Sequence, residues 1–306
     1  MSLKVGLNLS NMDTAVADAE KAEQFGFDYI GTGEHLFFHT ATPNSFVQLA
    51  AAAGATSRIR LVSAVTLLPL YPAPLVAKLA ASLDRVSGGR FELGIGSGGE
   101  FPAEFTAAGV EVSERFRRVT EGLHVIEQLF TGEKVTFDGE FTRLTDVALQ
   151  PPPHQRGGPP LWLGGRKQGA IRRAGRFADV WMPYMVDPEM LNATLTQVRR
   201  HATEHGRNAE DVKGAVFAWT CVDDDRDWAR ATGVEAASAN YQQDFSKLAD
   251  KYLLLGSPDD IVARLREFAD AGTETVLLQI AAGAENSQRV IRTIAEQVLP
   301  RLATLH

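Results

Sequence analysis

The sequence predicts an α/β fold of the (β/α)8 class, the TIM barrel, with insertions after some of its strands. Eight short runs rich in apolar and β-branched residues alternate with helical stretches along the 306 residues, and closed barrels of this kind commonly have that length. The helical stretches repeat apolar residues at helical spacing, as Val76, Leu79, Ala80 and Leu83 do. A doubly wound open sheet is the alternative that the same alternation allows.

The elements follow one another in a regular order until one interruption. We expect strands at residues 4–9, 28–32, 59–66, 91–95, 161–163, 179–182, 215–222 and 275–280. We expect helices at residues 14–25, 46–53, 76–83, 113–130, 169–175, 189–204, 258–271 and 291–298.

Residues 132–158 break the alternation. Val135 to Phe137, then Asp138-Gly139 and Phe141, predict a small hairpin with a tight turn. The stretch then runs into a proline- and glycine-rich segment that ends near residue 160. Because the alternation resumes afterwards, we interpret these residues as an insertion in a single domain that spans residues 1–306.

Composition and charge exclude several classes of protein. The formal net charge is −7, and an acidic surface repels phosphate backbones, so nucleic acid is not an expected partner. Cys221 is the lone cysteine, which fits a reducing cytoplasm. The N-terminal residues do not have the pattern of a signal peptide, and no apolar run reaches the length of a membrane span. A cytoplasmic protein without a nucleic-acid or membrane partner is therefore expected.

A barrel carries its chemistry on the loops that follow its strands. Gly33-Glu34-His35 follows the second expected strand, so Glu34 and His35 are candidate catalytic residues, paired as a carboxylate and an imidazole. The alternative is a surface Glu-His dipeptide without a catalytic role. After the third strand come Ala64, Val65 and Thr66, whose small side chains suit a flat apolar ring lying on the backbone, although a plain buried strand end fits equally well.

Two glycine-rich loops are candidates for binding an anion. Ser97, Gly98 and Gly99 complete a G-x-G-x-x-G pattern after the fourth strand, but the acidic residue of a dinucleotide fold is missing, so we interpret them as a turn that approaches a ligand closely. Gly164, Gly165 and Arg166 follow the fifth strand and open a helix, which favours a phosphate site. The histidines and the lone cysteine form no metal-binding motif, so no metal is expected.

Three blocks of sequence carry a family resemblance: Glu20 to His35, Ser57 to Gly109 and Pro159 to Pro183. The middle block contains RFELGIGSGGE and is the most specific. Together they resemble the luciferase-like monooxygenase superfamily, in particular the branch of coenzyme F420-dependent oxidoreductases and its FMN-dependent relatives. The resemblance implies a barrel, often a homodimer, with the ring of the cofactor in its mouth.

The resemblance also implies roles for single residues. It implies a non-proline cis peptide bond at Ala64-Val65 behind the ring, and an acid-base histidine at His35. It implies that the loops 97–99 and 164–166 bind the side chain and phosphate of the cofactor. Members that oxidise sugar phosphates carry a tryptophan where this chain has His39 and a glutamate where it has Gly99, with Glu100 one position later. A sugar phosphate is therefore not the expected substrate, and a role for Glu100 is not predicted.

Three hypotheses follow. The first is an enzyme that transfers hydride between coenzyme F420 and a small organic substrate, with His35 as proton donor or acceptor. The second is an FMN-dependent monooxygenase, and the third is a flavin-binding protein without turnover. Titration with FMN and with F420 separates the first two. The segment 221–251 has no assigned role, beyond an expectation that Asp223, Asp224 and Asp225 lie at a helix start.

Overall fold

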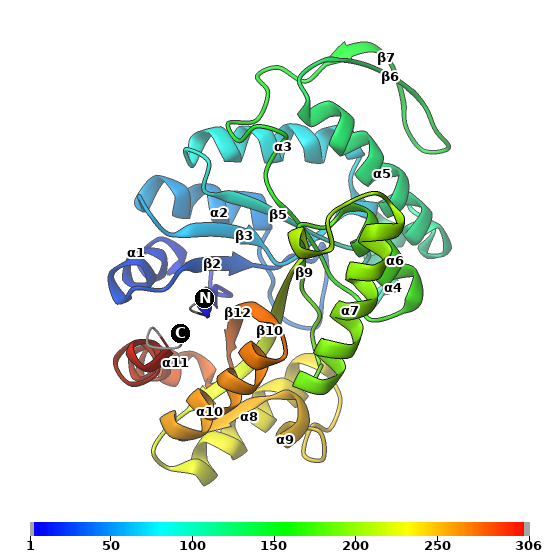
Figure 1. Ribbon diagram of the computed structural model, residues 1–306. Coiled ribbons are helices and arrows are strands. Elements are labelled where there is room, and N and C mark those ends of the chain that lie inside the picture. The colour runs from blue at the N-terminus through cyan, green and yellow to red at the C-terminus, as the bar shows by residue number, and fades with distance from the viewer. Residues whose placement is uncertain (1–2, 303–306) are drawn as a thin grey trace. The chain divides into compact units, whose positions relative to one another are not determined.

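The structure is a computed structural model that describes residues 3–302. The chain divides into two compact units. Unit 1 holds residues 3–9, 20–30 and 164–302, and unit 2 holds residues 10–19 and 31–163. Figure 1 colours the chain by residue number, so that the helices and strands of each unit can be followed in order.

Unit 1 is built on parallel strands. In the sheet β12 lies between β10 and β1, with β11 beyond β10, and β9 also pairs with β10. Lys4 of β1 is level with Thr275 of β12, and Asn8 with Gln279. The strands are β1 (Lys4–Asn8), β9 (Val180–Trp181), β10 (Lys213–Val222), β11 (Leu254–Gly256) and β12 (Thr273–Ile280); β2 (Tyr29–Thr32) follows β1 in the sheet order.

The helices of unit 1 begin at residues that cap them. Ser257 forms a reciprocal capping box with Asp260, and Asp187 and Asp225 accept hydrogen bonds from the first turns that follow them. The helices are α6 (Gln168–Phe177), α7 (Pro188–Glu204), α8 (Arg226–Tyr241), α9 (Ala249–Tyr252), α10 (Pro258–Asp270), α11 (Gly283–Thr293) and α12 (Leu299–Leu302). Helix α1 (Ala15–Phe25) lies on the boundary of the two units in sequence.

Unit 2 repeats the same plan. In its parallel sheet β5 lies between β3 and β8, and β4 pairs with the end of β5. Phe46 of α2 packs against Phe91 of β5, with ring centroids 6.0 Å apart, so this face of the strand belongs to the core. The elements are α2 (Ser45–Ala55), β3 (Arg60–Ser63), β4 (Thr66–Leu67), α3 (Ala73–Val86), β5 (Phe91–Gly96), α4 (Pro102–Ala107), α5 (Arg115–Phe130) and β8 (Leu161–Leu163).

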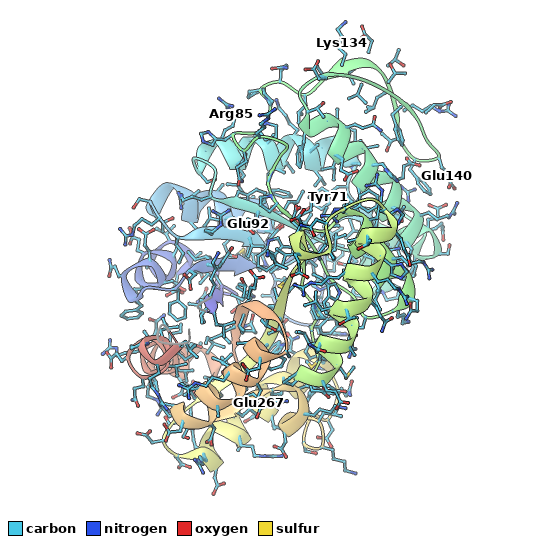
Figure 2. The ribbon with its side chains drawn as sticks, viewed as in Figure 1. Tyr71, Arg85, Glu92, Lys134, Glu140 and Glu267 are labelled. Atoms are coloured by element: carbon cyan, nitrogen blue, oxygen red, sulfur yellow. The ribbon has the colours of Figure 1, made fainter. Side chains whose placement is uncertain are left out.

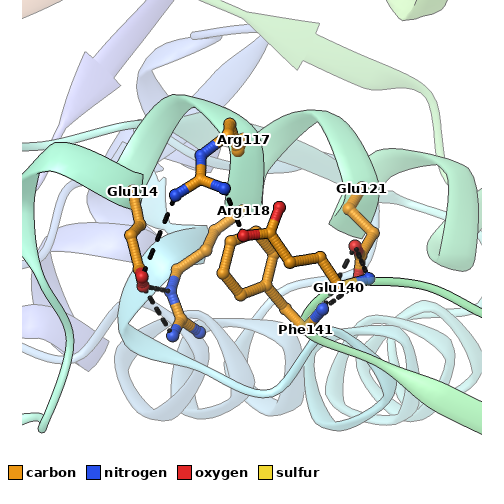
Figure 3. Close-up of polar contacts among 6 residues, drawn as sticks. All are labelled: Glu114, Arg117, Arg118, Glu121, Glu140 and Phe141. Carbon is orange, nitrogen blue, oxygen red and sulfur yellow. Dashed lines mark hydrogen bonds and ion pairs between the residues drawn. The ribbon is translucent and has the colours of Figure 1, made fainter.

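The predicted insertion forms an antiparallel hairpin that extends from the end of α5 (Figure 1). It comprises β6 (Lys134–Asp138) and β7 (Arg143–Ala148). The prediction of a tight turn at Asp138-Gly139 was wrong, because Asp138 pairs with Arg143 and a longer loop joins the strands. Glu121 of α5 holds that loop by accepting hydrogen bonds from the backbone N–H groups of Glu140 and Phe141 (Figure 3). A helix side chain therefore replaces the turn chemistry that the sequence suggested.

The sequence located the main strands within a few residues, with one informative exception. The third expected strand, 59–66, is interrupted: β3 ends at Ser63 and β4 begins at Thr66. The peptide bond in that gap, Ala64-Val65, is cis, as the resemblance implied. Elements α4, α8, α9 and β11 were not predicted individually. No helix in the described part of the chain is long and apolar enough to cross a membrane.

Candidate functional site

His35 pairs with a carboxylate that lies far from it in the sequence. Its Nδ1 atom is 3.2 Å from each carboxylate oxygen of Glu104, which belongs to α4. Glu104 also accepts a hydrogen bond from the backbone N–H of Leu36, at 3.1 Å. The Glu104 side chain is 0% exposed and that of His35 is 16% exposed. The imidazole is therefore fixed at one nitrogen, while its Nε2 has no hydrogen-bond partner within residues 3–302.

Aromatic side chains surround this imidazole. Phe38 stacks on the ring of His35, with centroids 4.0 Å apart and planes 15° apart. Phe101, from the loop after β5, contacts Phe38 and His39 edge-on. The stacking fixes the plane of the imidazole and limits the water around it. His39 belongs to the same aromatic cluster.

The predicted Glu34–His35 pair does not form. The Glu34 carboxylate is buried and accepts hydrogen bonds from several neighbouring residues. The donors are Ser45 N and Oγ at 3.1 and 2.8 Å, Asn44 Nδ2 at 3.1 Å, and Leu67 N at 3.1 Å. Successive residues of an extended segment point in opposite directions, so Glu34 turns toward α2 and β4 while His35 turns toward α4. Glu34 thus ties three segments together, and none of these hydrogen bonds joins it to His35.

Tyr71 completes the network around Glu34. Its hydroxyl accepts a hydrogen bond from Asn44 Nδ2 at 2.8 Å, and Figure 2 shows its place in unit 2. Burial raises the pKa of Tyr71 well above its ordinary value, and the negative charge of Glu34 and a hydrogen bond to Glu34 raise it further. Tyr71 therefore stays neutral beside a buried carboxylate, as a hydrogen-bonding group and not as a base.

The segment around the cis bond lies against glycines of its neighbours. A Cβ atom on Gly96 would come within 2.4 Å of Val65 Cγ2, and one on Gly33 within 2.9 Å of the Ala64 carbonyl oxygen. Ala64 and Val65 are half-buried, which leaves them available to a ligand. Thr66 differs: it is buried, and its hydroxyl lies 3.2 Å from Ser45 Oγ. The side chain of Thr66 is thus engaged within the fold, and its contact with a cofactor stays a prediction.

The next strand, β5, needs a glycine at its centre. A Cβ atom on Gly94 would lie 1.8 Å from the carbonyl oxygen of Ser63. The Ser63 hydroxyl in turn donates to the Gly94 carbonyl and accepts from the Gly94 N–H, both at 2.9 Å. The G-x-G pattern of the sequence thus begins with a close approach of two backbones. The ligand-binding part of the pattern begins only after β5 ends.

The loop after β5 has the glycine conformations that the sequence suggested. Gly98 and Gly99 have φ angles of +56° and +109°, and both are half-buried together with Ser97. The guanidinium of Arg115 lies against Gly99, since a Cβ atom there would be 2.8 Å from Arg115 Nε. Glu100 is exposed. Ser97, Gly98 and Gly99 therefore present a hydroxyl and backbone N–H groups beside a cation, which suits an anionic ligand.

The loop after β8, in unit 1, is the other predicted anion site. Gly165 has a φ of +97°, and its carbonyl accepts a hydrogen bond from Trp181 Nε1 at 3.1 Å. Arg166 is exposed, its Nη1 donates to the Met185 carbonyl at 2.6 Å, and its guanidinium lies over the Tyr184 ring. Gly164 and Gly165 are half-buried. The loop is open to solvent at the start of α6, as a phosphate site requires.

The residues present fit a flavin or a deazaflavin. Within unit 2, the half-buried Ala64-Val65 backbone and its glycine neighbours offer an apolar surface for a flat ring, and the loop 97–99 offers donors for an anionic side chain. Within unit 1, the loop 164–166 offers donors of the same kind. Among residues 3–302, no group of three or more His, Cys, Asp or Glu side chains is placed to hold a metal ion.

Comparison with known proteins agrees with this fit. Residues 5–275 match the model of the luciferase-like monooxygenase family. The chain is 29% identical to an F420-dependent glucose-6-phosphate dehydrogenase of Nakamurella multipartita, over 96% of this chain and 92% of that protein. It is 26% identical to the FMNH2-dependent dimethylsulfone monooxygenase of Pseudomonas putida, over 94% and 87%. The solved structure of the monooxygenase RslO1 from Streptomyces bottropensis superposes with a TM-score of 0.87 at 27% identity, covering 97% and 99% of the two chains.

The chain therefore belongs to the luciferase-like monooxygenase family and is an oxidoreductase. The predicted fold class, a parallel (β/α)8 barrel, is confirmed by the structural match. The family includes F420-dependent and FMN-dependent members. The hypothesis of a flavin-binding protein without turnover does not agree with relatives that are enzymes.

Proposed function

We propose that the protein is an F420-dependent oxidoreductase that transfers hydride between the deazaflavin and a small organic substrate. The observation that carries this proposal is the imidazole of His35, held by Glu104 at Nδ1 and left without a partner at Nε2. Such an imidazole can exchange a proton with a substrate oxygen while the cofactor carries the hydride. The likeness to an F420-dependent dehydrogenase supports the choice of cofactor.

The pairing determines which nitrogen of His35 does the work. When Nδ1–H donates to the ionised carboxylate of Glu104, the neutral ring has its lone pair on Nε2. In the oxidation of an alcohol, Nε2 would accept the hydroxyl proton, and the bound cofactor would supply the acceptor for the hydride. In the reduction of a carbonyl, the protonated ring returns that proton to the oxygen. The negative charge of Glu104 stabilises the imidazolium in either direction, so Glu104 positions and supports His35.

Other residues would hold and orient the cofactor, which supplies the hydride when bound. Ala64 and Val65 would lie behind its ring. The predicted binding residues Ser97, Gly98, Gly99, Gly164, Gly165 and Arg166 would bind its side chain. The apolar rings of Phe38 and Phe101 limit water near the imidazole, which strengthens the electrostatic interaction between His35 and Glu104.

Titration of the apo-protein with F420 and with FMN, followed by fluorescence quenching, tests the cofactor assignment. We expect saturable binding of F420 and weaker binding of FMN. Oxidation of reduced F420 by a panel of small ketones and aldehydes then identifies substrates. Failure to bind F420 would remove the proposal, whichever substrates were tried.

An FMN-dependent monooxygenase is the second candidate. It is favoured by the likeness to the Pseudomonas putida monooxygenase and to RslO1. In that case FMN binds more tightly than F420, and addition of reduced FMN and substrate consumes oxygen in proportion to product. Oxygen uptake with reduced FMN, compared with uptake in the absence of substrate, separates the two candidates.

Three expectations from the sequence stay predictions. They are the homodimer, the cytoplasmic location and the single domain. Sedimentation equilibrium measures the first directly, and a single unfolding transition that includes both compact units would support the last.

A further inference from the structure

Asn8, the last residue of β1, has a side-chain oxygen without a partner. Its Nδ2 donates a hydrogen bond to Oε1 of Gln279 in β12, at 2.6 Å. Its Oδ1 is buried and accepts no hydrogen bond from any group among residues 3–302. Buried polar atoms of native proteins are normally paired, so this oxygen indicates a bound donor.

The neighbouring groups determine that the unpaired atom is an oxygen and not an amide nitrogen. Gln279 Nε2 donates to the Ile280 carbonyl at 3.4 Å, and a reversed Gln279 amide would place two oxygens together there. Because Gln279 Oε1 is thus turned toward Asn8, a reversed Asn8 amide would place its own oxygen against Oε1. The two amides therefore leave an acceptor, which an O–H or N–H group satisfies and another carbonyl does not.

The unpaired oxygen belongs to a row of three side chains near the carboxyl ends of their strands. Asn8 is level with Gln279, and Gln279 is level with Trp219 of β10, so the three side chains face the same side of the parallel sheet. The indole of Trp219 donates its N–H to the Tyr241 hydroxyl at 3.2 Å. The one donor that Trp219 carries is therefore used, and it does not satisfy Asn8.

The row beneath contains no polar side chain. It consists of Gly6, Leu277 and Phe217, which are level with one another two residues earlier in the same strands. Leu277 fills the space above Gly6, since a Cβ atom on Gly6 would lie 2.8 Å from Leu277 Cδ1. This row therefore offers no side-chain donor to Asn8. A donor has to come from beyond the strand ends, where closed barrels bind their substrates.

Thr273 provides a contrast at the other end of β12. It is the first residue of the strand, it is buried, and its Oγ1 also lacks a partner within residues 3–302. In closed barrels the starts of the strands serve stability, whereas their carboxyl ends serve binding. Asn8 and Thr273 thus carry unpaired polar atoms at opposite ends of neighbouring strands, and Thr273 is a matched control for Asn8.

We propose that Asn8 Oδ1 binds an O–H or N–H group of the substrate that is separate from the reacting carbon–oxygen group, and that Gln279 positions the Asn8 amide. The inference rests on the proposed function and names its substrate class: ketones, aldehydes or alcohols that carry a second hydroxyl or amino donor. A site of this kind rejects the matching ether, because the ether would leave the buried amide oxygen unpaired.

Matched pairs of ketones isolate the donor. Hydroxyacetone is compared with methoxyacetone, and meta- and para-hydroxyacetophenone with the corresponding methoxyacetophenones. Each ketone takes a hydride from reduced F420 at its carbonyl carbon and a proton at its oxygen, but only the hydroxy member donates a further hydrogen bond. In at least one pair the kcat/KM of the wild type should favour the hydroxy ketone about 10-fold.

Three variants assign that preference to Asn8. In Asn8→Leu, which has a similar volume and no polar atom, the preference should be lost. In Gln279→Leu the Asn8 amide can reverse, so the preference should fall to an intermediate value. Thr273→Val, which removes the other unpaired atom, should keep the preference of the wild type. Saturable binding of F420, followed by fluorescence quenching, verifies that each variant is folded.

The possible outcomes separate the inference from the function. If the wild type does not bind F420, both fail. If it binds F420 but prefers no hydroxy ketone, or reduces none of the pairs, the inference alone fails. A preference that persists in Asn8→Leu would also overturn the inference, since Asn8 Oδ1 would then be paired with an ordered water. Equal losses of preference in Thr273→Val and Asn8→Leu would show a general effect on the sheet and contradict a specific role of Asn8.

Discussion

Two buried carboxylates are associated with His35: Glu34 is its neighbour in the sequence, and Glu104 is its partner in space. Their surroundings differ. Glu34 precedes His35 in the sequence and accepts four hydrogen bonds from Asn44, Ser45 and Leu67. Glu104 follows 69 residues later and accepts from His35 and from the backbone of Leu36. Both are buried, at 5% and 0% exposure. Glu34 therefore bonds to groups that do not change their protonation, whereas Glu104 bonds to the imidazole of His35, which can gain or lose a proton.

Glu34 is adjacent to His35 in the sequence, yet Glu104 is the carboxylate that contacts the imidazole. A carboxylate with all its lone pairs bonded to backbone and hydroxyl donors stabilises the fold, and moving a proton there would break several bonds. A carboxylate bonded to imidazole loses little when the ring gains a second proton. Substitutions around Glu34 should therefore lower the free energy of unfolding, whereas substitutions of His35 or Glu104 should lower turnover.

The largest effect is expected at His35. In His35→Asn the amide nitrogen can replace Nδ1 toward Glu104, but nothing replaces Nε2. Turnover should fall by roughly 10²- to 10⁴-fold, the usual contribution of general acid–base catalysis, and cofactor affinity should change little. Steady-state kinetics with a substrate found in the panel, together with cofactor titration, measure both. Equal losses in turnover and cofactor affinity would show that His35 serves binding alone.

The next effect is a loss of stability at Glu34. In Glu34→Gln the amide NH2 group must face a donor, either Leu67 N on one side or Ser45 and Asn44 on the other. Unfolding in urea should show a loss of about 2–3 kcal/mol, because buried donors lose their acceptor. Turnover of the variant that remains folded should be close to that of the wild type. A stable Glu34→Gln with low turnover would reverse the assignment of the two carboxylates.

Glu104→Gln should give the opposite result, with lower turnover and a smaller loss of stability than Glu34→Gln. Loss of a charged hydrogen-bond partner for the imidazolium predicts turnover lower by roughly 10- to 100-fold. Steady-state kinetics measure this loss, and unfolding in urea measures the stability of the same variant. A loss of stability without a loss of turnover would mean that Glu104 acts on the fold and not on His35.

The smallest effect is expected at Tyr71. Tyr71→Phe removes one hydrogen-bonding hydroxyl, with a loss of about 1 kcal/mol near neutral pH. The raised pKa of Tyr71, caused by burial and then by Glu34, means that the folded protein keeps this proton where the unfolded chain loses it. Wild-type stability should therefore fall as the pH rises above the ordinary tyrosine value. The stability of Tyr71→Phe should not show that fall, and urea titrations across this range compare the two. Parallel curves would refute the role of Tyr71 beside Glu34.

Most strands and helices could be predicted because their apolar residues recur at the spacing typical of each element. The elements that were not predicted lack this spacing. Helix α8 buries Ala229, Gly233 and Ala237, small residues that give no strong apolar stripe, although the expected acidic helix start was confirmed by the capping role of Asp225. Helix α4 is six residues long, too short for periodicity to be visible.

The candidate site was predictable where it depends on backbone. The turns at Gly98, Gly99 and Gly165 and the cis bond after Ala64 follow local patterns or the family resemblance. Glu104 was missed because its partner lies 69 residues away, and nothing in a single sequence links such positions. Arg115 was not predicted either, because only the folded chain shows that its guanidinium lies beside Gly99.

The position of the proton on the neutral His35 ring distinguishes the roles of the two carboxylates. Nitrogen NMR of protein labelled with 15N-histidine, with the His35 signals identified by their absence in His35→Asn, reports which ring nitrogen is protonated in the neutral form. If Glu104 holds Nδ1–H, the Nε2 signal should be that of an unprotonated nitrogen, and this preference should weaken in Glu104→Gln while persisting in Glu34→Gln. A neutral ring with its proton on Nε2 would contradict the assignment of Nε2 as the proton-accepting atom.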